Sequence, residues 1–386
     1  MGWWLDWPPA FESSGKLARR IIPCESLVAQ RVFSIACGYP DANDSARLSG
    51  DPIHKLLLDR DPIEGRDLAS QPTLSRFENR VGVKELYRLG EFLAGSVIRR
   101  HAKRLRHRAD RVTIDLDPTD DPTHGAQQLS FFNGHYDTWC YLPVMGFVSF
   151  DDEAEQYLCT AVLRPGNVTA AVGAVALLRR LVGMVRQQLP GVQIRVRLDG
   201  GFAHPAVLAF LDTQPKLEYV VAMAKNAVLK RIAETGMRRA RQLSRRSEKT
   251  EHIYGEVRYA ARKWPCQRRV IIKAEVVRTA DKDPKDNPRS VITNMKQSPH
   301  QLHQLLGQSV PCPAHRRCLR PDAGVALAGC RYLLCPRSSW HAARTIAKAG
   351  ARVLVSVRRV VVHLPASFPF LPAFRSVALA LGAATG

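Results

Sequence analysis

The sequence predicts a mixed α/β layer fold with a helical N-terminal region and a β-rich segment beyond the core. Three observations support this prediction. Residues 26–108 show mostly helical spacing of apolar side chains, residues 111–224 alternate strand-like and helical patterns, and two β-rich segments follow a basic helix that starts near residue 226. Strands that alternate with helices bury their apolar sides by packing in layers, which favours an α/β arrangement.

The N-terminal region is expected to be helical. Apolar side chains fall on one helical stripe over 26–37, and a second helical pattern covers 83–107. The second helix ends in a basic stretch that contains Arg99, Arg100, Lys103 and Arg104. Such a charge run is either a solvated helix face or a surface that contacts phosphates.

The pattern changes at Arg111, where short alternating segments begin. The segment 112–117 has one apolar face and carries Thr113, Asp115 and Asp117 on the other. Further strands are expected at 139–150, 158–163, 193–199 and 217–224, and a long helix at 168–188.

A very basic helix is expected at 226–249, and the last strands follow it. Arg238, Arg239 and Arg245 on this helix are candidate DNA contacts, although a solvated face explains them equally well. β-rich patterns cover 253–260 and 268–278, and a final strand is expected at 290–294.

Basic residues outnumber acidic ones, with 57 Lys and Arg against 35 Asp and Glu and a formal net charge of +22. Each phosphate that such a protein neutralises adds affinity, so we expect a polyanionic partner: nucleic acid first, an anionic membrane surface as the alternative. A basic surface that serves solubility alone is the remaining interpretation. No run of 18 apolar residues predicts a membrane span, and the nine cysteines are spaced too irregularly for a disulfide framework. We therefore expect a cytoplasmic protein without a membrane partner.

Two aspartates stand where strands end and turn residues follow. Asp117 closes the strand at 112–117, and Asp199 closes the strand at 193–199 just before Gly200 and Gly201. Ligands of open α/β sheets bind at the carboxyl ends of strands, and two carboxylates there can share divalent cations. Aspartate at a strand end is also ordinary turn chemistry, and spacing alone does not separate the two interpretations.

The motifs around these aspartates resemble those of bacterial insertion-sequence transposases of the DDE type. The stretch 114–128 with Asn133-Gly-His-Tyr136 resembles their first-aspartate block, and Arg197-Leu-Asp-Gly-Gly-Phe202 is similar to their second. Residues 68–79 resemble the block before the catalytic core, and Arg289-Ser-Val-Ile-Thr-Asn294 the strand that leads towards the catalytic glutamate. The blocks occur in the family's order across residues 28–300, and the likeness returns at about 350–380.

This resemblance implies an RNase H-like mixed sheet with flanking helices and a β-rich insertion. It implies a helical DNA-binding region (1–108), the first part of the core (109–224), a basic helix with a β-rich insertion (225–288), the last core strand (289–302), an aberrant segment (303–349) and a family-like tail (350–386).

The resemblance also implies the chemistry of the site. Asp117 and Asp199 would be two of three carboxylates that bind two Mg²⁺ (or Mn²⁺) ions. Asp117 matches the first acid better than Asp115, a weaker candidate on the same face of the strand. The protein would cleave and join double-stranded DNA at the inverted terminal repeats of a mobile element. It would self-associate on that DNA, in the bacterial nucleoid.

The family pattern stops after residue 302. The family carries its catalytic glutamate on a helix after the last strand, but no glutamate occurs from Val276 to Gly386, so no third catalytic acid is found. The segment 303–349 is crowded with Cys, Pro, Arg and His and shows neither helical nor strand periodicity. A zinc site is an alternative use of its His303, Cys312, His315, Cys318, Cys330 and Cys335, although zinc sites favour closer cysteine pairs.

Three hypotheses about function follow from these features. The first is a DDE transposase whose copy here is inactive because the glutamate is missing, and the second is a catalytically dead DNA-binding remnant. The third is an RNA-binding protein that uses the same basic surface, with Trp139 and Trp264 as candidate stacking residues. Each tryptophan lies beside a strand pattern, however, and is expected in the core.

We infer that an internal deletion and a frameshift produced residues 303–349, with the original frame restored near residue 350. Translation of the gene in all three frames should therefore reveal a helix-like transposase sequence across these codons in another frame. If no frame contains one, the hypothesis is wrong.

Overall fold

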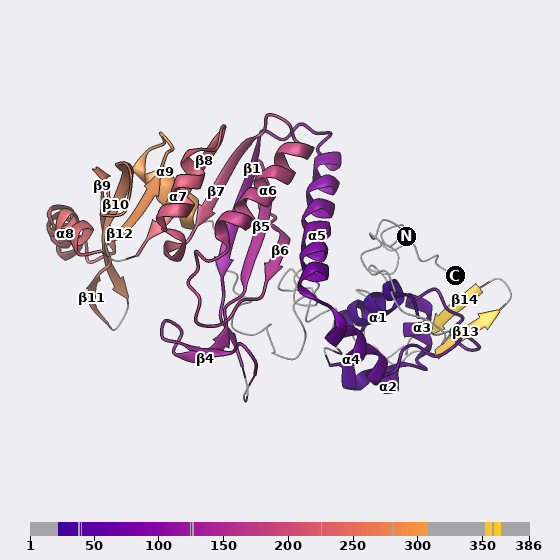
Figure 1. Cartoon of the computed structure of the whole chain (residues 1–386). Coiled ribbons are helices and arrows are strands. Elements are labelled where there is room, and N and C mark those ends of the chain that lie inside the picture. The colour runs from indigo at the N-terminus through magenta and orange to yellow at the C-terminus, as the bar shows by residue number, and fades with distance from the viewer. Residues whose placement is uncertain are drawn as a thin grey trace. The chain divides into compact units, whose positions relative to one another are not determined.

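The computed structural model describes residues 22–37, 39, 41–123, 125, 127–224, 226–279, 282–307, 352–356 and 359–363 (Figure 1). The chain forms two compact units, and the division falls inside helix α5 (Val83–Arg104), between Phe92 and Leu93. Ala94, Ile98 and Ala102, in the C-terminal part of α5, are buried in the core of the second unit.

The first unit is helical among its described residues up to Phe92. Its elements are α1 (Cys24–Ala36), η1 (Ala42–Asp44), α2 (Ser45–Leu48), α3 (Pro52–Leu57), α4 (Gln71–Arg80) and the start of α5. The buried Gln30 side chain donates to the carbonyl of Ala69 (2.8 Å) and accepts from its N–H (2.9 Å). Leu27, Ala69 and Leu74 form a small core beside this pair. Strands β13 (Arg352–Ser356) and β14 (Arg359–His363) pair antiparallel in the same unit.

The centre of the second unit is a mixed sheet of five core strands. β6 (Tyr157–Val162), β5 (Val144–Phe150) and β1 (Arg111–Pro118) pair antiparallel, and β7 (Gln193–Leu198) and β8 (Leu217–Met223) continue parallel to β1. Three antiparallel strands followed by two parallel ones, with flanking helices, form the RNase H-like core that the motifs implied (Figure 1).

Helices cover the apolar face of this sheet. α6 (Ala174–Gln188), α7 (Pro205–Asp212) and the C-terminal part of α5 share one continuous core with the apolar face of β1 and β7. Ile114 and Val196, which contribute to it, are fully buried because alternate residues of both strands point towards the helices. Among the described residues, no helix combines the length and the apolar character that a membrane crossing requires.

The β-rich insertion extends the main sheet. β12 (Arg289–Thr293) pairs antiparallel with β8, β10 (Arg268–Thr279) pairs with β12, and β9 (Glu251–Tyr259) and β11 (Lys282–Asp286) pair with β10. Helix α8 (Ala227–Ser247) packs on β9 and β10 through Leu229, Ala233, Met237 and Ala240. A short helix, α9 (Pro299–Gly307), follows β12 and buries Leu302 against Val220 and Ile271.

Two predicted elements differ from the structure in their bounds. The strand expected at 139–150 is divided into β4 (Thr138–Tyr141) and β5, because the chain leaves one sheet and enters another at Leu142 and Pro143. With β2 (Asp121–Pro122) and β3 (Phe131–Asn133), β4 forms a separate three-stranded sheet. The helix expected at 168–188 begins at Ala174, because turns occupy the residues before it.

A buried ion pair joins the two central strands. Asp115 lies opposite Arg197 in the parallel register of β1 and β7. The guanidinium donates through Nε and Nη2 to the two carboxylate oxygens, each at 2.7 Å, and both residues are at most 5% exposed. Paired, bidentate geometry compensates both charges for the water they lose.

We expect Arg197→Met to lower the free energy of unfolding by about 3–5 kcal/mol, because it leaves the Asp115 carboxylate buried without its partner. The double variant Asp115→Leu/Arg197→Met should recover most of this loss, since an apolar pair leaves no buried charge. Urea unfolding followed by circular dichroism measures both. A double variant as unstable as the single one would contradict this account of the pair.

Candidate active site at the carboxyl ends of β1 and β7

The pairing of β1 with β7 brings Asp117 and Asp199 to the same edge of the sheet. The parallel register runs from Arg111 opposite Gln193 to Leu116 opposite Leu198. Asp117 and Asp199 occupy the next position of that register. Each lies two residues beyond a member of the Asp115–Arg197 pair, so both side chains fall on the same face of the sheet as that pair. Two acids 82 positions apart in the sequence thus become neighbours.

Asp199 has the electrostatics of a paired carboxylate. Partial removal from water and the neighbouring Asp117 carboxylate raise the pKa of Asp199 to about 6, although hydrogen bonds from the following backbone and the nearby His135 oppose the rise. The residue stays exposed to solvent, so the surrounding protein removes only part of its hydration. A carboxylate whose pKa is raised by burial and by a second carboxylate is a candidate for a functional site.

The backbone after Asp199 turns sharply because two glycines follow. Asp199 Oδ1 accepts from the Gly201 N–H (3.0 Å) and so caps the short helix η2 (Gly200–Phe202). A Cβ on Gly201 would lie 2.7 Å from the Cβ of Ala170, and one on Gly200 would lie 3.1 Å from the Ala224 nitrogen. The Gly-Gly pair therefore allows the turn to pass close to its neighbours.

Asp115, the weaker candidate, has a different environment. Both of its carboxylate oxygens accept from Arg197, and it is almost fully buried. Burial raises the pKa of Asp115, and the Arg197 guanidinium opposes that rise. These contacts favour a role in joining the strands over a role as a metal ligand.

Tyr136 is a site residue whose individual role was not predicted from the sequence. It lies in the turn between β3 and β4, and burial with the negative charges of Asp120, Asp199 and Asp117 raises its pKa to about 12. Its hydroxyl therefore keeps its proton at neutral pH and remains a hydrogen-bond donor beside the two acids. The motif Asn133-Gly-His-Tyr136 was the available signal, because it belongs to the first-aspartate block.

Arg164 is a second such residue. It is 7% exposed and holds the turns before α6, donating through Nε to Leu142 O (2.9 Å) and through Nη1 to the carbonyls of Thr169, Ala170 and Val172. Burial lowers its pKa to about 10, and the nearby Tyr136 and Asp199 oppose that shift. Its Nη2 atom has no hydrogen-bond partner among the described residues. Arg164 thus places a cation near the acids and fixes the adjacent loop.

Helix α9, which follows the last core strand, supplies no third acid to this edge. Arg197 Nη1 donates to Leu305 O (3.2 Å), so the C-terminal end of α9 reaches β7 two residues before Asp199, but α9 contains no Asp or Glu. Within the described ranges, no group of three or more His, Cys, Asp or Glu side chains is arranged to hold a metal ion. Of the zinc alternative, His303 lies in α9, and Cys312, His315, Cys318, Cys330 and Cys335 lie outside the described residues.

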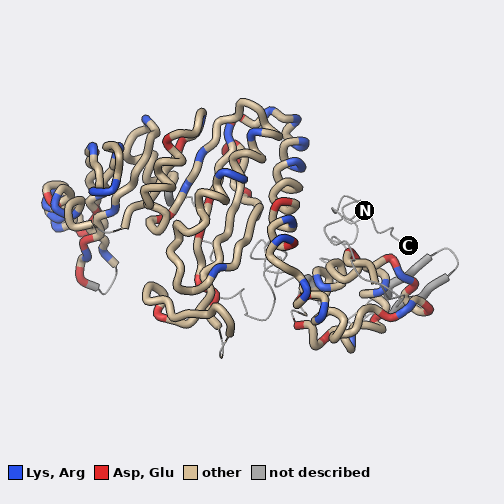
Figure 2. The backbone as a smooth tube through the Cα atoms, viewed as in Figure 1, with Lys and Arg blue, Asp and Glu red and all other residues tan. Residues whose placement is uncertain are grey.

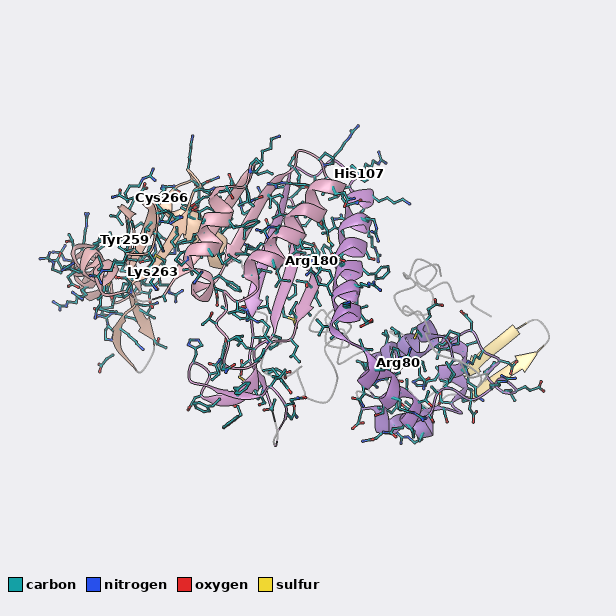
Figure 3. All side chains as sticks on the ribbon, viewed as in Figure 1. Arg80, His107, Arg180, Tyr259, Lys263 and Cys266 are labelled. Atoms are coloured by element: carbon teal, nitrogen blue, oxygen red, sulfur yellow. The ribbon has the colours of Figure 1, made fainter. Side chains whose placement is uncertain are left out.

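The candidate DNA-binding residues lie on two helices where Lys and Arg are frequent (Figure 2). Arg99, Arg100, Lys103 and Arg104 are exposed near the C-terminal end of α5, close to His107, which Figure 3 labels. Arg104 is already paired with Glu153 at 2.7 Å. Arg238, Arg239 and Arg245 are exposed on the outer side of α8, whereas Arg241 is held by Glu234 and Asp286.

The two tryptophans have opposite environments. Trp264 packs against the core, contacts Tyr259 edge to face, and lies under the Arg268 guanidinium, as expected for a core residue; Tyr259 is labelled in Figure 3. Trp139 is 59% exposed, so the expectation that it lies in the core is wrong. Trp139 lies on β4 of the small separate sheet, and the strand pattern did not reveal that the strand expected at 139–150 is divided between two sheets.

Comparison with known proteins identifies the family. The family described as transposase DDE domain group 1 matches residues 10–308, and no curated protein matches the chain. Among solved structures, the Mos1 transposase paired-end complex with left transposon end shares 13% identity with a TM-score of 0.18, over 53% of this chain and 59% of that one. A pre-cleavage Mos1 transpososome shares 12% identity with a TM-score of 0.19, over 54% and 61%. The chain thus spans about three fifths of these structures' chains.

We expect Asp199→Asn to stabilise the metal-free protein above pH 6. The pKa of about 6 lies above the ordinary 3.8, so the fold binds this proton more tightly than the unfolded chain does. Ionisation therefore costs stability progressively between these two pH values and fully above the upper one. Because solvent screens an exposed group, the rise in Tm at pH 7.5 in EDTA should be only about 1–2 °C.

Differential scanning fluorimetry between pH 3.5 and 8 measures this effect. The difference between wild type and Asp199→Asn should vanish below the ordinary pKa of aspartate. Asp283→Asn, a change at an exposed carboxylate in β11, serves as the control and should show no such dependence. A pH-independent Tm difference for Asp199→Asn would show that the pKa of Asp199 is not raised.

Proposed function

Because the chain belongs to the group 1 family of DDE-domain transposases, we propose that it acts on the terminal inverted repeats of an insertion sequence through Asp117 and Asp199. One observation supports these residues above all: each acid directly follows the last pair of the parallel register, Leu116 opposite Leu198, so the carboxyl ends of the two strands bring the acids together. Phosphodiester cleavage and strand transfer need such paired carboxylates at an accessible edge.

The donors at this edge fit a divalent cation with oxygen ligands, Mg²⁺ or Mn²⁺. Two carboxylates face the same side, and the charge of Asp117 disfavours ionisation of Asp199, so a cation would relieve this repulsion. Asp117 and Asp199 would hold the metal, which when bound polarises the phosphodiester and favours attack by water or a 3′-hydroxyl. Asp115 would not be a ligand, because both of its carboxylate oxygens accept from Arg197.

The other groups around the site would bind and orient the DNA strand. Tyr136 keeps its proton and can donate a hydrogen bond to a phosphate oxygen beside the acids. The buried cation of Arg164 lowers the electrostatic cost of bringing another negative group close to Asp199.

The DNA backbone would contact the basic sides of α5 and α8. Arg99, Arg100 and Lys103 on α5, with Arg238, Arg239 and Arg245 on α8, are exposed and suited to phosphates. Arg104 would contribute less, since Glu153 already offsets its charge. We further propose that the protein works in the bacterial cytoplasm, on nucleoid DNA, and self-associates there.

The missing glutamate sets the level of activity that we expect. No glutamate follows Glu275 in the sequence, so the acid that the family carries after its last core strand is missing from its usual place. With two of three carboxylates, turnover should be low while DNA affinity persists through the basic helices. The second candidate function is therefore a DNA-binding remnant that occupies element ends without cutting them.

The test is Mg²⁺-dependent nicking of a labelled terminal-repeat duplex by the full-length protein, with DNA affinity measured in parallel. We expect tight binding and slow or undetectable nicking. Any nicking should fall at least about 100-fold in Asp199→Asn, because the site loses a metal ligand. Asp283→Asn, an exposed carboxylate in β11, is the matched control and should behave as wild type.

The outcomes separate the two candidates. Nicking that disappears in Asp199→Asn would mean that another group replaces the missing glutamate. Binding without nicking, lost in the triple variant Arg238→Ala/Arg239→Ala/Arg245→Ala, would favour the DNA-binding remnant. Nicking that is unaffected by Asp199→Asn would contradict the assignment of the site.

A further inference from the structure

Two aromatic side chains are unusually exposed on the small sheet beside the acids. Phe132 on β3 and Trp139 on β4 are opposite each other across the two strands, with 49% and 59% of their surface exposed. Their ring centroids are 6.3 Å apart and their planes meet at 64°, in an edge-to-face contact. Apolar rings exposed to water lack the favourable free energy of burial. Their exposure on this sheet indicates a partner that covers them.

The strands that carry these rings are held in place from several sides. Asn133 Nδ2 donates to Gly166 O (2.7 Å), and the Thr123 N–H donates to Trp139 O (2.9 Å). A Cβ on Gly166 would lie only 2.0 Å from Cys140 O, so the two backbones touch. The backbone that carries the rings is therefore held in place before any ligand binds, which reduces the entropy lost on binding.

Connectivity places the rings close to the acids. β1 contains Asp117, and only four residues later β2 begins at Asp121, which pairs with Tyr141 of β4. The Thr119 N–H also donates to Pro143 O (3.0 Å), just past the end of β4. The turn between β3 and β4 carries Tyr136, and the charges of both acids help to raise the pKa of its hydroxyl. A strand whose phosphate lies at Asp117 and Asp199 thus passes within a few nucleotides of the rings.

We propose that Phe132 and Trp139 stack on one or two unpaired bases of the DNA strand whose phosphate lies at Asp117 and Asp199. This inference rests on the proposed function and deepens it, since it assigns to the site a substrate with locally opened ends. Every base has a π-face, so stacking on such rings accepts any sequence. Asn133, His135 and Thr138 beside the rings are polar and suit a nucleic-acid strand.

The size of the surface favours bases over a protein partner. A fully exposed aromatic side chain presents about 150–250 Å². Two that are about half exposed offer roughly 200 Å² together, far less than the ~800 Å² per partner of a stable protein interface. One or two bases would cover such an area.

The experiment compares two duplexes of the same sequence, one blunt and one with a three-nucleotide 3′ overhang that contains 2-aminopurine. We expect full-length protein to bind the overhang duplex at least about 5-fold more tightly, and to quench 2-aminopurine, which fluoresces less when stacked. Trp139→Ala and Phe132→Ala should reduce or abolish both effects, whereas Trp139→Phe should retain most of them. Affinity for the blunt duplex should not change in any variant.

Leu163→Ala is the control, because Leu163 is an exposed apolar side chain (37%) that lies outside the small sheet and outside residues 1–108. Circular dichroism confirms that each variant folds. An overhang preference that persists in folded Trp139→Ala and Phe132→Ala would overturn the proposal. So would a dimer, detected by sedimentation, that dissociates in Trp139→Ala while the overhang preference stays intact, because the rings would then bind a second copy.

The failure of this inference is distinguishable from that of the proposed function. Overhang preference that depends on Trp139, in a protein that never nicks DNA, would support stacking while the catalytic assignment fails. Nicking that depends on Asp199, with no effect of either ring on overhang affinity, would support the catalytic assignment and overturn stacking.

Discussion

The parallel pairing of β1 with β7 is the constraint on which the candidate site depends. A shift of one residue would turn the acids of one strand to the opposite face of the sheet. The buried, bidentate pair between Asp115 and Arg197 opposes such a shift, because any other register would separate two charges that water cannot reach. Asp115 and Arg197, which fix the register, thus lie two residues before Asp117 and Asp199, which we propose to carry the chemistry. Asp115 matters to the site through the strand that it holds in register.

A hairpin and several turns pack at the same edge of the sheet. The β3–β4 hairpin and the turns around Arg164 touch each other through Asn133, Gly166 and Cys140, and the turn after Asp199 packs against Ala170. These segments leave the acids accessible and add a protonated phenol, a buried guanidinium and two exposed rings beside them. The sheet supplies the carboxylates, and the loops supply the groups suited to a nucleic-acid strand.

The insertion has a structural and an electrostatic part. Because β12 pairs with β8 and β10 with β12, its strands extend the core sheet and share its hydrogen bonding. α8 uses its apolar side to cover β9 and β10, which leaves its arginines on the outer side. A helix that packs on a sheet in this way presents a fixed row of positive charge. Arg241, paired with Glu234 and Asp286, fastens the helix to β11 instead of adding to that row.

The sequence by itself predicted the α/β class, because strand alternation and helical spacing are local properties; the resemblance of its short motifs implied the RNase H-like core and pointed to Asp117 and Asp199. It also showed that no glutamate follows Glu275. Only the tertiary structure decided that Asp115 is held by Arg197, that Trp139 is exposed, and that Tyr136 and Arg164 lie at the site. Each of these depends on contacts between segments far apart in the chain, and one strand pattern fits a core strand and an exposed hairpin equally well.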